Sequence, residues 1–356
     1  MEKKKQLYLL ALMAVSLIVV VLGALFSSFA GKEPRIIFLD DDDTLDSVYT
    51  KTAMNRSFLA RPTFALLSTL TGYGAHIRPG RYDVGSGTST LQVFRSLRNG
   101  RQTPVRLTIP VLRTNRDLAE FLGKNFQAKT ADFEVILQDS SILATYDKTP
   151  ATVMCLFVPN TYEIFWTSSP KAVIARMHKE YQNFWNEKRT MEAKQLGLTP
   201  NQVTTVASIV EQETAYNPEK PMVAGMYLNR LKQNMPLQAD PTVKFALGDF
   251  TLRRILNQHL RVNSPYNTYK QKGLPPGPIC IPSVESINAV LHRAEHDYLY
   301  MCAKEDFSGS HNFATTYAEH QKNAAKYTAA LNARCIRSLC WWLRECSNLK
   351  YKVLFS

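Results

Sequence analysis

An apolar run near the start of the chain limits what the chain can fold into more than any other feature. Residues 7–26 (LYLLALMAVSLIVVVLGALF) carry no charge and follow the three lysines at positions 3–5. A helix of about 20 residues rises about 30 Å, which matches the hydrocarbon core of a bilayer. The run therefore predicts one membrane-spanning helix. The lysines ahead of it predict a cytoplasmic amino terminus, with the rest of the chain on the other side.

A cleaved signal peptide is the alternative interpretation of this run. The string Ser28-Phe29-Ala30 places small residues at the spacing that a signal peptidase requires. The apolar run is longer than the core of about 7–15 residues that is usual in signal peptides, which favours an uncleaved anchor. We therefore expect residues 1–30 to form a cytoplasmic amino terminus and a transmembrane helix.

The length and charge of the whole chain limit the classes of protein to which it can belong. Its 356 residues exceed what one hydrophobic core usually organises, and a hydrophobic fraction of 45% excludes a disordered chain. The 43 Lys and Arg residues outnumber the 30 Asp and Glu residues, and the net charge of +13 suits nucleic acid, a membrane surface or an anionic polymer. No nucleic-acid-binding motif stands out, so we expect no nucleic-acid partner.

The cysteines and the clustered acids predict neither a metal site nor a disulfide framework. The six cysteines include no C-x-x-C pair, which excludes a zinc ribbon and a thioredoxin-type motif, and dispersed cysteines are typical of buried small hydrophobes. The run from Asp40 to Asp43 lacks the glycine and the spacing of a calcium loop, so it predicts a solvated charged stretch. We expect no cofactor.

Short helical and extended patterns alternate after the apolar run, as in an α+β fold. Residues 79–84 predict a turn and a strand, residues 90–97 predict a helix that ends at Asn99-Gly100, and residues 105–109 predict another strand before Pro110. We expect three parts beyond the anchor: a linker and small module over 31–110, a larger α+β body over 111–333, and an atypical tail over 334–356.

The stretch 199–217 predicts the most informative helix, because it opens with a capping box of Thr199 and Gln202 and continues with an apolar stripe. At 100° per residue, Glu213 lies about 60° from the centre of the stripe, whereas Glu211 lies about 100° away, on its edge. Burial raises the pKa of a carboxyl group toward the range that a general acid needs. The plainer interpretation is a helix-end glutamate whose carboxyl group reaches water.

Three loops downstream combine a restricted backbone with neutral hydrogen-bonding side chains. Prolines and glycines fix their conformation, while Gln, Asp, Asn, Thr and Tyr supply hydrogen bonds and stacking surface. Such a lining suits a sugar, although ordinary surface turns share this composition. The loops are residues 235–242 (MPLQADPT), 264–269 (SPYNTY) and 273–278 (GLPPGP).

An ordered set of strings closely resembles the endolytic murein transglycosylase (MltG/YceG-like) family. The resemblance covers residues 111–333 as a catalytic region, and residues 80–100 resemble the membrane-proximal LysM-like subdomain of that family more weakly. Residues 281–283 (IPS) depart from the Asn or Thr, Pro and Gly that often stand there in the family. The matching strings are ASIVEQET (207–214), NRL (229–231), LQADPT (237–242), NTY (267–269) and GLPPG (273–277).

The resemblance implies a lytic transglycosylase that cuts the MurNAc–GlcNAc bond within nascent glycan strands, leaves 1,6-anhydro-MurNAc ends and limits strand length. It implies an enzyme on the periplasmic side of the cytoplasmic (inner) membrane, with peptidoglycan as substrate and cell-wall synthases as candidate partners. By position, the catalytic glutamate of the family falls on Glu213. The candidates for binding the strand are Glu211, Asn229, Gln238, Asp240, Asn267 and Tyr269.

Two other functions stay open on the sequence. Residues 292–296 (HRAEH) match the H-x-x-E-H signature, so His292, Glu295 and His296 are candidate residues of a zinc-dependent hydrolase. A non-catalytic anchor that binds the cell wall would keep the apolar helix and the small module without needing Glu213. The tail after Ala333, with three cysteines and two tryptophans, predicts either a membrane-surface segment or a reading-frame accident.

Overall fold

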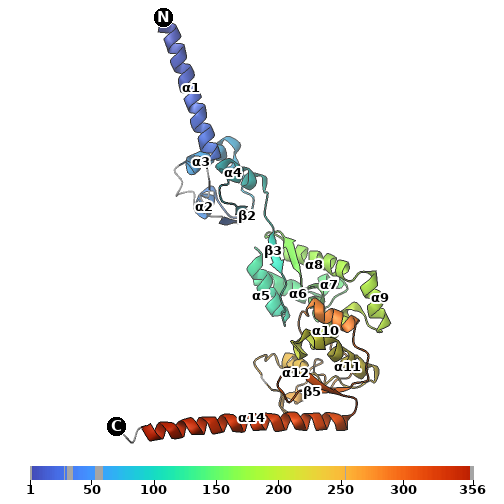
Figure 1. Ribbon diagram of the computed structural model, residues 1–356. Coiled ribbons are helices and arrows are strands. Elements are labelled where there is room, and N and C mark those ends of the chain that lie inside the picture. The colour runs from blue at the N-terminus through green and yellow to red at the C-terminus, as the bar shows by residue number, and fades with distance from the viewer. Residues whose placement is uncertain (1, 28, 30–34, 53–58, 253, 353–356) are drawn as a thin grey trace. The chain divides into compact units, whose positions relative to one another are not determined.

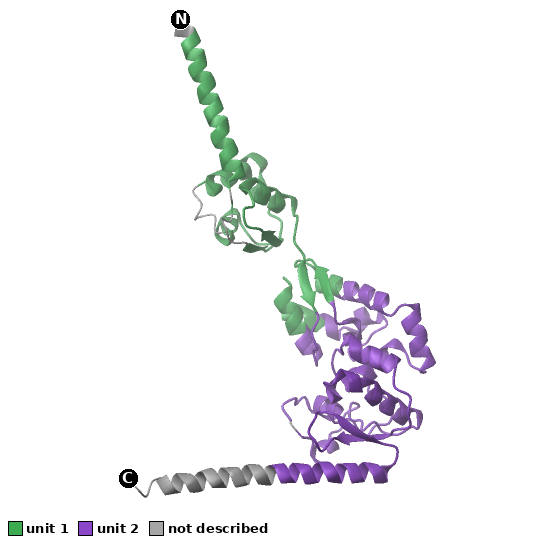
Figure 2. Ribbon diagram, viewed as in Figure 1, with its two compact units in different colours: residues 1–108, 119–135, 161–173 green, residues 109–118, 136–160, 174–356 purple. Residues whose placement is uncertain are grey.

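The computed structural model describes residues 2–27, 29, 35–52, 59–252 and 254–352, of which 2–3 and 335–352 are described through the backbone alone. The chain forms two compact units, shown in different colours in Figure 2. The first contains residues 1–108, 119–135 and 161–173, and the second contains residues 109–118, 136–160 and 174–356. Helices and strands are mixed along the chain, as the α+β prediction requires (Figure 1).

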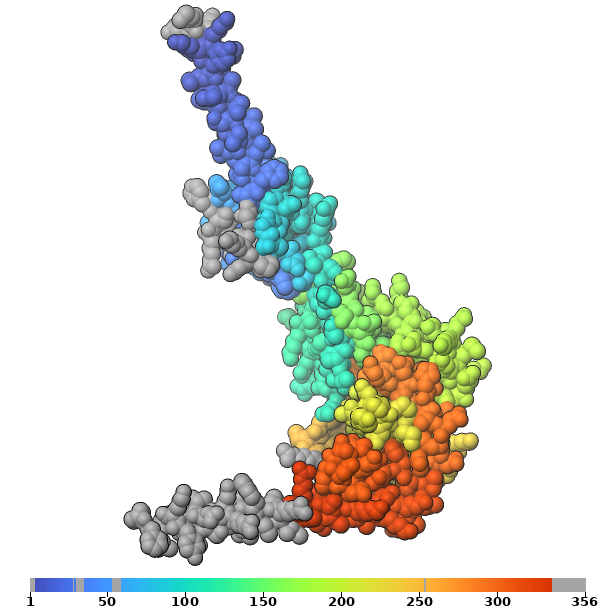
Figure 3. All heavy atoms as spheres, viewed as in Figure 1, coloured from blue at the N-terminus to red at the C-terminus, as the bar shows by residue number. Residues whose placement is uncertain are grey.

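The first helix, α1 (Glu2–Phe26), contains an apolar segment, Lys4–Phe26, that is long enough to cross a membrane. Its apolar side chains are exposed: Leu7, Leu12 and Leu17 are 70%, 66% and 65% exposed, in the helix coloured blue in Figure 3. A helix of this length and exposure fits a membrane anchor or a signal sequence. Positions 28 and 30 of the candidate cleavage string lie outside the described residues.

A small module with its own core follows α1. Its strands β1 (Arg35–Leu39) and β2 (Gly80–Val84) pair antiparallel, with Ile37 opposite Tyr82. The rings of Phe64, Tyr73 and Phe94 meet edge to face in its buried core, an arrangement that aromatic quadrupoles favour. The predicted strand over 79–84 and helix over 90–97 are confirmed. The module's helices are α2 (Leu45–Lys51), α3 (Ala60–Thr71) and α4 (Thr90–Asn99), with a 3₁₀ turn at Tyr73–Ala75.

The acidic run after β1 is less solvated than predicted. Lys51 places its ammonium group 2.8 Å from a carboxylate oxygen of Asp40 and 2.5 Å from one of Asp43. Only 5% of the Asp43 side chain is exposed. The expectation of a fully solvated stretch is therefore wrong at Asp43, because a lysine eight residues downstream neutralises it.

A second pair of strands, β3 (Val105–Thr108) and β4 (Thr161–Ile164), is also antiparallel, with Leu107 opposite Tyr162. The predicted strand over 105–109 is confirmed. Helices α5 (Asn115–Asn125) and α6 (Thr130–Gln138) lie between the two strands in the sequence. Both helices contribute residues to each unit, so the division of the chain does not fall at a single boundary near Pro110.

The second unit is built around α10 (Pro200–Glu213), which contacts α11 (Lys220–Lys232) and α13 (Val284–Leu291). Val206 and Val210 of α10 belong to the buried core between these helices. The remaining elements are α7 (Ser140–Ala144), α8 (Pro170–Phe184), α9 (Glu187–Gln195), α12 (Asp240–Leu247), β5 (Tyr300–Ala303), β6 (His311–Ala314), α14 (Tyr317–Lys352) and 3₁₀ turns at Val153–Leu156, Asn217–Glu219 and His259–Arg261.

Helix α10 begins as the sequence predicts and ends earlier. The Thr199 hydroxyl accepts a hydrogen bond from the Gln202 amide, and the Gln202 side chain accepts one in return from the Thr199 amide. The helix ends at Glu213 rather than at residue 217, because Thr214 adopts an extended backbone (φ −140°, ψ 132°). Glu213 is therefore the last helical residue, at the point where the chain turns away.

Two of the cysteines behave as predicted, since Cys155 and Cys280 are free and buried. Cys302 is free and half-buried on β5. The three cysteines and two tryptophans of the tail lie among side chains outside the described part of the structure. The backbone of residues 335–352 belongs to α14.

Candidate active site

Glu213 lies in a cleft of about 310 Å³ in the second unit. The cleft is bounded by the end of α10, by α11, by the loop that leads into α12, and by the β5–β6 hairpin with the start of α14. Its lining is mostly polar and aromatic. The lining residues are Glu213, Met226, Tyr227, Arg230, Leu237, Gln238, Asp240, Tyr269, Tyr300–Ala303, His311, Tyr317 and His320.

The carboxyl group of Glu213 is bonded to a buried tyrosine. The Tyr227 hydroxyl, on α11, donates a hydrogen bond to Oε1 of Glu213. Burial raises the pKa of Glu213 to about 7, although the hydrogen bond from Tyr227 opposes this shift. Burial and the neighbouring Glu213 also raise the pKa of Tyr227, which keeps its phenol group protonated as a donor. Glu213 can therefore exchange a proton near neutral pH.

A strained loop residue lies next to this pair. Gln238 has a left-handed backbone (φ 54°), which is rare for residues other than glycine. Its amide donates to the Thr268 carbonyl at 3.1 Å, and its side-chain oxygen accepts from Arg230 at 2.6 Å. Arg230 also donates to the backbone carbonyls of Pro236 and Leu299. Arg230, on helix α11, thus binds both the loop that contains Gln238 and the segment just before β5. These contacts hold Gln238 in the cleft.

A second carboxyl group, that of Asp240, also lines the cleft. The Tyr269 hydroxyl donates to its Oδ1 at 2.6 Å. The negative charge of Asp240 contributes, after burial, to the raised pKa of Glu213. The cleft therefore holds one carboxyl group whose pKa lies near neutral pH and a second carboxyl group that accepts a hydrogen bond from Tyr269.

An imidazole and a buried carboxylate form a further pair at the cleft. Nδ1 of His311 is 2.8 Å from Oε2 of Glu219, and the His311 amide donates to Oε1 of Glu219 at 2.7 Å. Only 7% of the Glu219 side chain is exposed. A carboxylate bonded to one ring nitrogen fixes the orientation of an imidazole. Glu219 therefore positions the His311 ring in the cleft lining.

Aromatic rings form the side of the cleft that belongs to the hairpin and to α14. The ring of Tyr300 stacks on His320, with centroids 5.5 Å apart, and lies 5.8 Å from the ring of Tyr317. The Arg230 guanidinium lies over the Tyr300 ring at 5.6 Å. Rings packed in this way offer flat apolar surface beside hydroxyl groups, which suits the faces of sugar rings.

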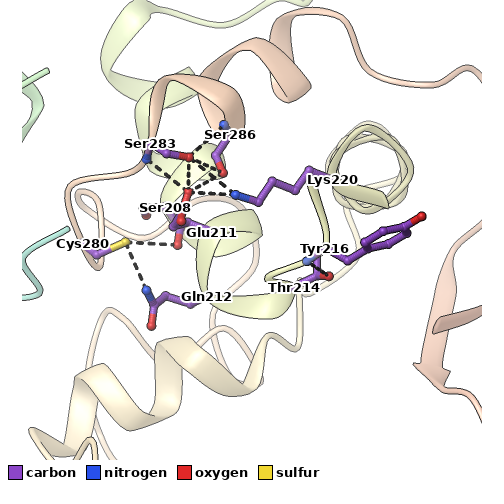
Figure 4. Close-up of polar contacts among 9 residues, drawn as sticks. All are labelled: Ser208, Glu211, Gln212, Thr214, Tyr216, Lys220, Cys280, Ser283 and Ser286. Atoms are coloured by element: carbon purple, nitrogen blue, oxygen red, sulfur yellow. Dashed lines mark hydrogen bonds and ion pairs between the residues drawn. The ribbon is translucent and has the colours of Figure 1, made fainter. Parts of the chain in front are cut away.

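Glu211 lies in a separate polar cluster with Lys220, Ser283 and Ser286 (Figure 4). Its Oε2 accepts hydrogen bonds from the hydroxyls of Ser283 and Ser286, both at 2.5 Å, and lies 3.2 Å from the Lys220 ammonium group. Burial alone would raise the pKa of Glu211, but these hydrogen bonds and the charge of Lys220 lower it. Glu211 is thus an ionised structural residue, rather than a group on the solvent edge of the helix stripe.

Residues 281–283, where the sequence differs from the usual family pattern, contribute Ser283 to this cluster. Ser283 is the N-cap of α13, and its hydroxyl accepts from the Ser286 amide. Both its amide and its hydroxyl also bond to Glu211. Ser283 therefore both caps the N-terminus of α13 and links α13 to α10 through Glu211.

The predicted binding residues separate into two groups. Gln238, Asp240 and Tyr269 line the cleft with Glu213. Glu211, Asn229 and Asn267 lie outside the set of described residues that line it.

The two asparagines bond to the backbone instead. The Asn229 amide donates to the carbonyls of His296 and Tyr298, and the Asn267 amide donates to those of Leu260 and Val262.

The H-x-x-E-H string does not form one helical face. Helix α13 ends at Leu291, so the two histidines do not lie one helical turn apart on a helix, as the zinc alternative would require. His292 lies 3.6 Å from Glu192, whereas Nε2 of His296 is 3.0 Å from the Met222 carbonyl oxygen. Across the described residues, no three His, Cys, Asp or Glu side chains are grouped to hold a metal ion.

No role is predicted from the sequence for Tyr227, Arg230, Glu219 or His311, although all four belong to the site or support it. Arg230 belongs to the NRL string, and Tyr227 stands two residues before it. The interpretation of residues 229–231 as part of a loop is wrong, because they belong to helix α11. Glu219 and His311 stand in none of the matching strings, and their pairing depends on the packing of β6 against the 3₁₀ turn at Asn217–Glu219.

Comparison with known sequences places this site in a family. The sequence model of the YceG-like family matches residues 37–326. The chain belongs to the YceG-like family. The family match thus includes the cleft, the strings around Glu213 and the small module.

Relatives of this YceG-like chain carry a functional name. The endolytic murein transglycosylase of Bacillus subtilis (strain 168) is 38% identical over 167 residues, which are 47% of this chain and 45% of that protein. The protein of that name from Streptococcus pneumoniae (strain D39) is 28% identical over 285 residues, 70% of this chain and 51% of that protein. The chain spans about half the length of these curated relatives.

A solved structure also resembles this YceG-like chain. It is the 2.6 Å crystal structure of a YceG-like protein from Listeria monocytogenes, with a TM-score of 0.53 and 27% sequence identity. The match covers 82% of this chain and 99% of that one.

Proposed function

We propose that the protein is an endolytic lytic transglycosylase that cleaves the MurNAc–GlcNAc bond of peptidoglycan and leaves 1,6-anhydro-MurNAc ends. The observation that carries this proposal is the Glu213 carboxyl group, which has a pKa of about 7, is bonded to Tyr227 and lies in the cleft. The names of the relatives support the substrate class. Gln238, Asp240 and Tyr269, which belong to two strings of the resemblance, line the same cleft and support the proposal.

One carboxyl group is sufficient for this reaction. Protonated Glu213 donates its proton to the glycosidic oxygen, and the bond from C1 of MurNAc breaks with its electron pair remaining on O4 of GlcNAc. The Glu213 carboxylate then takes the proton of the MurNAc 6-hydroxyl while that oxygen bonds to C1. The acid is regenerated, and no water is consumed.

The cleft lining supports specific roles in binding the strand. We propose that Gln238, Asp240 and Tyr269 contact the sugar, with Tyr300 and Tyr317 as stacking surface. Glu211, Asn229 and Asn267 are positioning residues in this proposal, because their polar atoms are engaged by other parts of the chain. Arg230 and Glu219 hold Gln238 and His311 in place.

The products of digestion test the proposal. Purified peptidoglycan treated with the full chain is expected to yield fragments with 1,6-anhydro-MurNAc ends by mass spectrometry. Fragments with reducing ends would instead indicate a hydrolase that uses Glu213 with Asp240 as the second carboxylate. Unchanged strands that sediment with the protein would indicate a non-catalytic anchor.

The position of the protein in the cell is part of the same proposal. We propose that α1 anchors the chain in the cytoplasmic membrane, with residues 31–110 as a linker and LysM-like module and residues 111–333 as the catalytic domain on the periplasmic side. The exposed apolar helix supports the anchor, and the separate core of the module supports an independent binding role. Strand-length control beside cell-wall synthases would follow from this location. Retention in the membrane fraction after a carbonate wash tests the anchor.

A further inference from the structure

A second, smaller hollow of about 140 Å³ lies at the end of α10, and some of its lining residues are sequence neighbours of residues that line the cleft. Gln212 lines the hollow and Glu213 lines the cleft, while Pro241 lines the hollow and Asp240 lines the cleft. The two hollows therefore share the end of α10 and the first turn of α12. The lining of the smaller one is Arg113, Gln212, Pro241, Lys244, Phe250 and Ile279.

Its charged residues are both positive. The Arg113 guanidinium lies 4.9 Å from the centre of the Phe250 ring and donates one hydrogen bond, at 3.3 Å, to the side-chain oxygen of Gln212. The Gln212 amide nitrogen is in turn 3.6 Å from Sγ of Cys280, so Gln212 is itself oriented (Figure 4). Lys244 is half-buried on α12.

Within the described residues neither cation forms an ion pair, although the charge of Lys244 acts on Glu213 and opposes the rise of its pKa. Among the described residues, no carboxylate oxygen lies within 4.0 Å of the charged nitrogens of Arg113 or Lys244. Two half-buried positive groups beside one hollow repel each other, and an anion between them would remove that cost. Stacking on Phe250 orients the guanidinium group and leaves donors at its edge available for a carboxylate.

We infer that the Arg113–Lys244 hollow is a subsite for a carboxylate on the peptide substituents that peptidoglycan strands carry on their muramic acid residues. The inference rests on the proposed function, because that function supplies a strand whose sugar lies in the cleft. The hollow has less than half the volume of the cleft, which suits an acidic group better than a disaccharide. The subsite would make the enzyme prefer peptide-bearing strands to bare ones.

Binding measurements test the subsite separately from catalysis. The full chain in detergent, carrying Glu213→Gln so that strands stay intact, is titrated with fluorescently labelled glycan strands, either peptide-bearing or stripped of peptide by an amidase. We expect peptide-bearing strands to bind about tenfold more tightly, the scale of one charge-assisted hydrogen bond. Adding Arg113→Gln or Lys244→Gln should remove that preference and leave the affinity for stripped strands unchanged.

Matched controls make the outcome decisive. Lys188→Gln, at an exposed position on α9, removes the same charge away from both hollows and should keep the preference. Lys244→Gln leaves the contacts of Arg113 with Phe250 and Gln212 in place, so it tests the charge even where Arg113→Gln lowers stability.

The possible outcomes separate the two proposals. Equal binding of the two strand types by the parent protein, or an equal loss on both types in the variants, would overturn the subsite. A preference that depends on Arg113 and Lys244, together with wild-type products that lack anhydro ends, would support the subsite and contradict the proposed reaction.

Discussion

The hydroxyl of Tyr227 donates a hydrogen bond to the carboxyl group of Glu213 across the contact between α11 and the end of α10. Burial and this hydrogen bond act in opposite directions on the same proton, since burial raises the pKa of Glu213 and the hydrogen bond lowers it. The balance leaves the pKa at about 7. The packing of two helices therefore sets both the direction and the acidity of the proposed catalytic group.

Tyr227→Phe should shift the pH dependence of cleavage. The acid form of Glu213 is the active one, so the wild-type rate should fall as the pH rises through about 7. Without the hydroxyl, the pKa of Glu213 rises further, and the decline should move to higher pH. We also expect a loss of about tenfold in kcat, because the carboxyl group loses a partner that orients it. A pH–rate profile of both proteins measures this, and an unchanged midpoint would contradict the account.

Glu213→Gln should alter stability in a pH-dependent way. The pKa of this carboxyl group is 4.5 in its ordinary state and about 7 in the fold, so wild-type stability falls as the pH rises from 4.5 through 7. Glutamine does not ionise, so the variant does not lose stability in this way as the pH rises. Between pH 5 and pH 8, the free energy of unfolding of the variant should therefore rise by up to about 3 kcal/mol relative to that of the wild type. Thermal melts at the two pH values test this, and an equal Tm difference at both would contradict it.

Glu211→Gln should damage the fold more than the chemistry. The variant leaves the ammonium group of Lys220, whose side chain is 4% exposed, without its counter-charge. We expect a loss of about 3 kcal/mol in the free energy of unfolding near neutral pH, the lower end of the cost of breaking a buried ion pair. Because the pKa of Glu211 is lowered in the fold, this loss should shrink as the pH falls below about 4.5. The double variant with Lys220→Met should recover part of the stability, and denaturant titrations would show whether it does.

Chelation should leave glycan cleavage intact. The proposed proton transfers use Glu213 and oxygen atoms of the substrate, so EDTA should not slow the reaction. His292→Gln should be close to neutral, since that residue only approaches Glu192 at the surface, whereas His296→Gln should lower the Tm through its lost contact with the Met222 carbonyl. Loss of cleavage in EDTA that zinc restores would favour the hydrolase alternative.

Local patterns in the sequence predicted the parts of the site that depend on one element. The capping box and the apolar stripe located α10 and directed Glu213 inward, because helical periodicity is a property of a few consecutive residues. The end of the helix was less predictable. Residues 214–217 contain no glycine, and Pro218 lies further along, so nothing in the string marks the turn at Thr214.

Partners on other elements could not be predicted in the same way. Glu211 lay on the edge of the predicted stripe, yet its surroundings depend on Lys220, Ser283 and Ser286, which arrive with α11 and α13. His311 and Glu219 are joined only when β6 packs beside a 3₁₀ turn. Gln238, Asp240 and Tyr269 were located through the family resemblance, and their convergence in one cleft is a property of the tertiary structure.

The rate of formation of 1,6-anhydro ends from purified peptidoglycan by the wild type, Glu213→Gln and Glu211→Gln tests the central claim most directly. Glu213→Gln keeps the size of the side chain and can still accept from Tyr227, but it cannot give up and retake a proton. We predict a loss of at least about 10² in rate for Glu213→Gln and a smaller loss for folded Glu211→Gln. The opposite ranking, or wild-type products with reducing ends alone, would contradict the assignment of Glu213 as the acid of a transglycosylase.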